Sequence, residues 1–160
     1  MEGNEVEPRK YVRMHIVKAV DMTRHQFCDI KKTEKVGEDE RGYFVIYPDG
    51  YESWCPKKQF EDAGRPCDGM TFGMAIEAMK RGKKVCRAGW NGKGMYLWLL
   101  PEAEVKREWC KDQMLIAAMG DRDALPCLGS IRMFTADKKV LTGWLASQTD
   151  ILAEDWQIVE

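Results

Sequence analysis

Two short segments of this chain concentrate side chains that can hold a ligand. Segment 87–94 contains three glycines, an indole, an amide and two cations within eight residues. Glycines let backbone N–H groups approach a ligand closely, and the indole of Trp90 offers a flat stacking face. Segment 144–156 adds hydroxyls, an amide and carboxylates after a strand-like run. Because aromatic faces stack on bases while amides, hydroxyls and charges bind sugars and phosphates, this pattern favours a small nucleotide as ligand.

Both segments also have a purely structural interpretation, which the sequence leaves open. Asn91 and Gly92 form a typical hairpin turn. Ser147 and Asp150 are spaced as at the start of a helix. Three further tryptophans, each taken singly, are expected to pack in the core, since Trp is largely buried in most proteins. They are Trp98, Trp109 and Trp156.

The sequence lacks the groupings that catalysis requires. Neither histidine, His15 or His25, lies in the part of the chain with the unusual loops, and no Gly-x-Ser-x-Gly, His-Glu-x-x-His or Walker-type pattern occurs. Asp150, Glu154 and Asp155 could act as paired carboxylates, but a helix start accounts for two of them without any further role. We therefore expect no catalytic residue and no cofactor.

Composition narrows the function further. The chain has 160 residues, 25 Lys and Arg against 26 Asp and Glu, and a net charge of −1, so it carries no footprint for nucleic-acid binding. The longest apolar run, 95–100, is too short to span a bilayer, and the polar N-terminus has no signal-peptide pattern. Six cysteines without a Cys-x-x-Cys pair suit reduced packing thiols rather than a metal site. We expect a cytoplasmic protein without membrane, nucleic-acid or metal partners.

The first part of the chain predicts a flexible tail over 1–10 and a small β-rich module over 11–66. Alternating apolar residues in 11–20 predict a strand, and Thr23 with Gln26 predicts a capped helix start. Residues 43–47 and 51–54 flank Pro-Asp-Gly and predict a hairpin. A short helix should begin at Pro56 and end near Ala63, before a linker over 65–69.

The second part, 70–160, predicts a compact domain with one main helix. Thr71 can cap this helix, whose apolar face is Phe72, Ile76 and Met79. Strands are expected over 84–87, 95–100, 131–135, 140–145 and 156–159, with a helical turn over 149–153. The nearly continuous apolar run 95–100 favours a central strand covered on both faces. Residues 102–129 leave two alternatives open, because 102–119 show some helical periodicity but the segment fits a long loop equally well. The predicted fold class is α+β, with antiparallel sheets in both parts.

Segments 71–95 and 131–156 together resemble the phage Thoeris anti-defence family of the second type. The resemblance covers about 70–160. It implies a sponge that sequesters glycocyclic ADP-ribose, the signal of bacterial TIR-domain proteins, without degrading it, and that can also hold cyclic oligonucleotides in a separate pocket. It further implies a homotetramer with pockets between subunits, working in the host cytoplasm. The alternative is a phage structural or assembly protein that uses its Trp loops for protein contacts.

On this basis we expect a ligand site with one wall from each loop and one residue from the main helix. The expected site residues are Phe72, Arg87, Gly89, Trp90, Asn91, Gly92, Lys93, Trp144, Ala146, Ser147, Thr149 and Asp150.

Two regions depart from the family pattern. The stretch 104–128 does not resemble it, and the N-terminal module is similar only to a small uncharacterised phage protein family, through 17–24 and 47–54.

Overall fold

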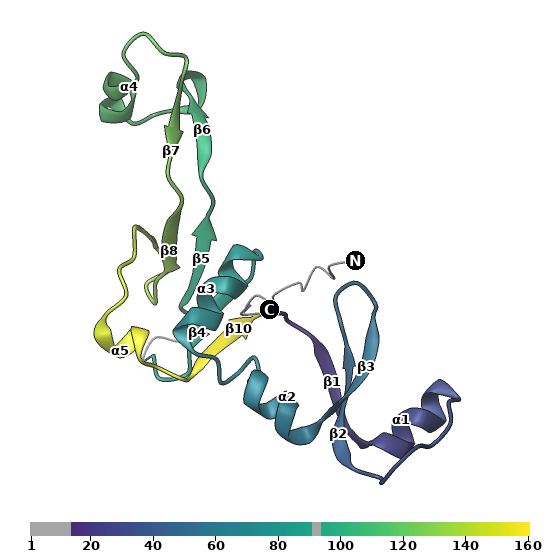
Figure 1. Ribbon diagram of the computed structural model, residues 1–160. Helices are drawn as coiled ribbons and strands as arrows, with labels where there is room; N and C mark the ends of the chain where they lie inside the picture. Colours follow the sequence, from purple (N-terminus) through teal and green to yellow (C-terminus); the bar gives the residue numbers. More distant parts are fainter. Residues whose placement is uncertain (1–13, 91–93) are drawn as a thin grey trace, which may run out of the picture. The chain divides into compact units, whose positions relative to one another are not determined.

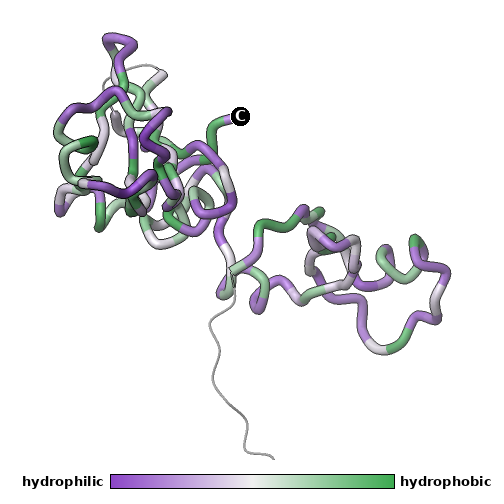
Figure 2. Tube along the Cα trace, turned by 90° about the horizontal axis from the view of Figure 1, so that it is seen from above, coloured by the Kyte–Doolittle hydropathy of each residue, from purple (hydrophilic) through white to green (hydrophobic). Residues whose placement is uncertain are grey.

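The computed structural model describes residues 14–90 and 94–160 (Figure 1). The chain divides into two compact units, Met1–Gly64 and Arg65–Glu160. The expected tail 1–10 and the site residues Asn91, Gly92 and Lys93 lie outside the described residues. No helix of the described ranges is long and apolar enough to cross a membrane. Along the trace, hydrophobic and hydrophilic residues alternate in short stretches (Figure 2).

The first unit is a three-stranded antiparallel sheet in the order β1-β2-β3, with two short helices. Its elements are β1 Lys18–Thr23, α1 Arg24–Lys31, β2 Arg41–Ile46, β3 Glu52–Pro56 and α2 Lys57–Ala63. The predicted hairpin is confirmed, with Gly50 in the left-handed region at φ +83° and its N–H donating to Tyr47 O at 2.9 Å.

Local signals in this unit are mostly confirmed. Thr23 caps α1, and Gln26 completes the capping box in both directions. Of the strand predicted over 11–20, residues 11–13 lie outside the described residues, 14–17 are not in a strand, and 18–20 belong to β1, which continues to Thr23. Lys18 pairs with Ile46, the last residue of β2, so the ladder between these two strands ends at this pair. Pro56 ends β3 and serves as the N-cap of α2, so this helix begins at Lys57, one position after the predicted start.

The second unit contains a five-stranded antiparallel sheet in the order β10-β4-β5-β8-β9 and a two-stranded sheet of β6 and β7. The mixed α+β class is therefore confirmed. The elements are α3 Phe72–Lys80, β4 Lys84–Arg87, β5 Tyr96–Leu100, β6 Ala103–Lys106, the 3-10 helix η1 Arg107–Trp109, α4 Gln113–Met119, β7 Ala124–Cys127, β8 Ser130–Phe134, β9 Val140–Thr142, α5 Gln148–Ile151 and β10 Trp156–Val159.

The core of this unit lies between α3 and one face of the larger sheet. Thr71 caps α3 by accepting a hydrogen bond from Met74 N–H, as predicted. The buried face of α3 consists of Ala75, Ala78 and Met79. The two small alanine side chains allow the helix to lie close to the strands. Phe72 and Ile76, also predicted for this face, are only half-buried. The facing sheet residues are Val85, Leu97, Met133 and Trp156, all buried.

The central position predicted for β5 is confirmed, but the prediction that both faces of this strand are covered is wrong. Leu97 is fully buried against the helix side, whereas Trp98 is half-buried and Leu100 is 37% exposed. Side chains alternate along a strand, so Tyr96, Trp98 and the paired Phe134 lie on the opposite face. Tyr96 stacks on Phe134 with ring centroids 5.2 Å apart. We call Tyr96, Trp98 and Phe134 the aromatic sheet face.

Residues 102–129 form neither one long helix nor a long loop, and of the stretch with helical periodicity only Gln113–Met119 is an α-helix, α4. They build a hairpin extension in which β6 and β7 continue β5 and β8 away from the sheet, with α4 beyond their ends (Figure 1). Leu100 pairs with Ser130 and Ala103 with Cys127, so the register continues unchanged across the break. A Cβ at Gly129 would lie 3.0 Å from Leu100 O and 3.2 Å from Glu102 N, so glycine suits this close approach of two backbone segments.

Gly42 provides a test of how separately the two units fold. A methyl group at Gly42 on β2 would lie 2.6 Å from Cζ2 of the Trp54 ring. We expect Gly42→Ala to destabilise the first unit by about 1–3 kcal/mol or more through overpacking. Hydrogen exchange should accelerate in β1–β3 but not in β4, β5 or β10. Gly73→Ala, where the nearest atom would be 3.9 Å from the new Cβ, is the control. Equal acceleration in both units would contradict separate folding.

Candidate functional site

Four aromatic rings meet where β4 ends and β10 begins. The Trp90 ring lies edge-on to Trp156, with centroids 5.5 Å apart, and edge-on to Trp144 at 6.2 Å. Phe72, at the start of α3, contacts Trp156 at 5.3 Å. We call these four residues the indole cluster. Only Trp156 is fully buried, so the other three rings keep part of their surface exposed.

The individual tryptophans differ in how well the sequence predicted them. Trp156 is a core residue, as expected, and its indole N–H donates to Asp150 O at 3.0 Å. Trp109 was predicted to pack in the core, and this was wrong, because it is 64% exposed in the hairpin extension. Trp98 is half-buried on the aromatic sheet face.

Arg87 joins the two loops that flank the indole cluster. Its Nε donates to Asp155 Oδ1 at 2.8 Å, and its Nη1 donates to Asp150 Oδ1 at 2.9 Å. The side chain is only 19% exposed. Because two carboxylates accept from one planar guanidinium, Arg87 ties the end of β4 both to α5 and to the start of β10. It serves as a cross-link in this arrangement.

Asp150 is the second centre of this network. Its Oδ2 accepts from the backbone N–H of Ser147 at 3.1 Å and from the Ser147 hydroxyl at 2.6 Å. Ser147 in turn accepts from Asp150 N–H, which completes a capping box at α5. The Trp90 indole N–H points to Asp150 Oδ1 at 3.5 Å. The helix-start interpretation of Ser147 and Asp150 is therefore confirmed, and the same carboxylate also contacts both loops.

The charges of these groups are stabilised by their neighbours. Burial raises the pKa of Asp150, but hydrogen bonds from Ser147 and Arg87 outweigh it and leave that pKa below its ordinary value. The hydrogen bond from Arg87 lowers the pKa of Asp155. The pKa of Arg87 is raised, first by Asp155 and then by Asp150. All three side chains are therefore charged at neutral pH.

The structure brings most of the expected site residues together. They are Phe72, Arg87, Gly89, Trp90, Trp144, Ser147, Thr149 and Asp150. Ala146 is half-buried beside Ser147. Sequence reasoning missed Asp155 and Trp156 as parts of this constellation. Trp156 pairs with Arg87 across β10 and β4, and a pairing between residues so far apart in the chain has no local signal.

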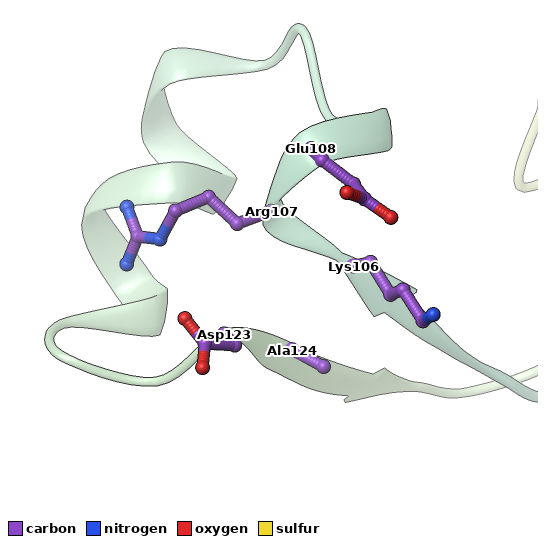
Figure 3. Close-up of a pocket in the computed structure, with 5 residues that line it drawn as sticks. All are labelled: Lys106, Arg107, Glu108, Asp123 and Ala124. Atoms are coloured by element: carbon purple, nitrogen blue, oxygen red, sulfur yellow. The ribbon is translucent and has the colours of Figure 1, made fainter.

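A hollow lies apart from the indole cluster, near the far end of the hairpin extension. It is open, has a volume of about 470 Å³, and is lined by Lys106, Arg107, Glu108, Asp123 and Ala124 (Figure 3). Arg107 donates to the backbone oxygens of Gly120 and Arg122. Since these bonds hold the turn after α4 in place, Arg107 has a structural role there. Across the described ranges, no group of three His, Cys, Asp or Glu residues is placed to hold a metal ion.

Comparison with known proteins assigns the second unit to a class of phage anti-defence domains. The model of the Thoeris anti-defense 2-like (Tad2-like) domain matches residues 70–159. The protein named Thoeris anti-defense 2 from Bacillus phage SP01 is 41% identical over 91 residues, which cover 56% of this chain and 94% of that protein. The chain belongs to the Tad2-like family. The matched range includes 104–128, the stretch that was thought to depart from the family, and leaves the first unit outside.

Acid should loosen the network around Arg87. Asp150 and Asp155 have pKa values below the unfolded value of about 3.9, so they contribute stability that is present above pH of about 4 and lost as pH falls through their folded pKa values. We expect Asp150→Asn to lower the free energy of unfolding at pH 7 by about 1–3 kcal/mol. The difference from wild type should shrink toward pH 3 in urea titrations.

Glu154→Gln is the matched control for this series. Glu154 pairs with Arg65 at the surface and is 61% exposed, so its charge should matter little. If Asp150→Asn and wild type lose stability in parallel over the whole pH range, the Arg87 network does not carry the acid sensitivity.

Proposed function

We propose that this protein is an anti-defence sponge that binds a cyclic nucleotide-derived immune signal and holds it without turnover. The proposed ligand is glycocyclic ADP-ribose, and the proposed site is the indole cluster with its two loops. The observation that supports this proposal is the cluster itself, in which Arg87, Asp150 and Asp155 hold partly exposed indoles next to each other within the family-matched unit.

Stacking is the main source of binding energy in this proposal. An adenine base has a flat π-face, and base–aromatic stacking contributes about 1–3 kcal/mol per base. Trp90 and Trp144 are half-buried, so each is both held and accessible. Thr149 is exposed and its hydroxyl lies 2.8 Å from Ser147 Oγ. We assign the reading of ribose hydroxyls to these two hydroxyl groups and to Asp150.

Capture without turnover is consistent with how the acidic groups are used. A general base needs a pKa near the working pH, whereas the pKa values of Asp150 and Asp155 lie below their ordinary range. Their oxygens already accept hydrogen bonds from Arg87, Ser147 and Gly89. The two carboxylates are therefore suited to hold the loops in fixed positions.

The proposed place of action is the host cytoplasm, where a diffusible signal can be intercepted. Cyclic oligonucleotides are proposed as a second ligand class.

Trp90→Ala tests the stacking role. We expect the affinity for glycocyclic ADP-ribose, measured by calorimetry, to fall by about 1–3 kcal/mol, that is about 5- to 150-fold, because one stacking face is lost. Trp109→Ala is the matched control, since Trp109 is 64% exposed in the hairpin extension and lies outside the cluster. Wild-type affinity in a folded Trp90→Ala protein would show that the ring of Trp90 does not bind the ligand.

Release of the ligand separates sequestration from the alternatives. After the protein is saturated with glycocyclic ADP-ribose and then denatured, a sponge returns the ligand unchanged. A chemically altered ligand would indicate an enzyme, and no uptake would favour a structural or assembly role.

The proposed assembly is a homotetramer with ligand sites between subunits. The aromatic sheet face supports it, because its rings are not fully covered within this chain. Arg132, which pairs with Trp98 on that face, has a buried Nε with no hydrogen-bond partner in the described structure. An unpaired buried donor costs about 1–3 kcal/mol, and a neighbouring subunit could supply the missing acceptor.

Native mass spectrometry tests this assembly. We expect the wild-type protein to appear as a tetramer and Trp98→Glu to shift it to smaller species, because the glutamate would place a charge in an apolar interface. Trp109→Glu, the same change at an exposed indole outside that face, should leave the number of subunits in the assembly unchanged. A wild-type monomer that binds ligand would contradict the proposal.

A further inference from the structure

Asp155 contacts three successive residues of the loop that carries Trp90. Its Oδ1 accepts from Arg87 Nε at 2.8 Å, its backbone oxygen accepts from Ala88 N–H at 3.0 Å, and its Oδ2 accepts from Gly89 N–H at 2.9 Å. One residue, directly before β10, therefore fixes the path of the chain as it leaves β4. We call residues 87–90 the Trp90 turn.

Gly89 is adapted to this contact. A Cβ at Gly89 would lie 3.1 Å from Asp155 Oδ2, which is closer than ordinary van der Waals contact. The missing side chain thus lets the carboxylate approach the backbone N–H. At the end of the turn, Trp90 N–H donates to Arg87 O at 3.3 Å. Its ring then lies edge-on to Trp156, the residue that follows Asp155.

Packing alone leaves Trp90 incompletely held. The residue is half-buried, and its indole N–H makes only a long contact of 3.5 Å with Asp150. The shorter and charged hydrogen bonds of the turn are those to Asp155. A binding surface that is ordered before the ligand arrives loses less conformational entropy on binding.

We propose that Asp155 is a positioning residue for ligand capture, because its carboxylate holds the Trp90 turn in the conformation that presents the indole of Trp90. This inference rests on the proposed function. Asp155 acts through Trp90 and need not touch the ligand. Glu154, the adjacent acidic residue, differs because its carboxylate pairs with Arg65 at 2.9 Å and is 61% exposed.

The decisive experiment is a double-mutant cycle on the full chain. Asp155→Asn keeps the shape of the side chain but replaces one acceptor oxygen by an NH2 donor, so only one of the two bonds from Arg87 Nε and Gly89 N–H can remain. We expect this change to weaken glycocyclic ADP-ribose binding about tenfold in the wild-type background. In the Trp90→Ala background the same change should have less than about a twofold effect, because the ring that it positions is gone. Glu154→Gln should bind like wild type.

A spectroscopic measurement on the free protein gives an independent readout. In Asp155→Asn, the order parameter of the Trp90 indole N–H measured by ¹⁵N relaxation should fall, while that of the buried Trp156 should not change. Wild-type affinity in Asp155→Asn, equal losses in both backgrounds, or an unchanged Trp90 order parameter would overturn the inference. If wild type itself takes up no ligand, the proposed function fails, and the order parameter still decides whether Asp155 holds Trp90.

Discussion

The arrangement of the second unit around the indole cluster depends on one guanidinium that donates to two carboxylates. Arg87 lies at the end of β4, Asp155 directly before β10, and Asp150 in α5, so one side chain joins these three parts of the chain. Only arginine provides a planar fork that can donate to two acceptors in fixed directions. Removing one carboxylate would leave the remaining groups with an incomplete set of partners in a partly buried place. The geometry of the loops therefore follows from this charge balance.

Rigid positioning explains why apolar rings can remain exposed in a small domain. Tryptophan is highly buried on average in folded proteins, whereas Trp90 and Trp144 are only half-buried. Here the loop before Trp90 is fixed by Asp155, and the loop after Trp144 is fixed by the capping box of Ser147 and Asp150. The polar network thus fixes the backbone on which Trp90 and Trp144 stand, and both rings lie edge-on to the fully buried Trp156.

Sequence reasoning succeeded where the signal was local. The caps at Thr23, Thr71 and Ser147 depend on residues three positions apart, and the Gly50 turn depends on a few neighbouring residues. It failed where geometry comes from distant pairing. The start of β1 depends on where β2 ends, and the role of Asp155 depends on the register of β10 against β4. The hairpin extension was missed because β6 and β7 are short strands that follow the register of β5 and β8.

The same contrast explains the apolar pattern of β5. A strand with Tyr96, Trp98 and Leu100 alternating with Leu97 and Leu99 is apolar on both faces, and such a pattern predicts cover on both. Within the second unit, α3 supplies cover for the face with Leu97 and Val85. The sequence therefore specifies more apolar surface than this one helix can bury. Burial of that surplus by another copy of the chain would favour association by about 25 cal/mol for each Å² removed from water. Pairing of Arg132 there would add to the gain, because its buried Nε would obtain an acceptor.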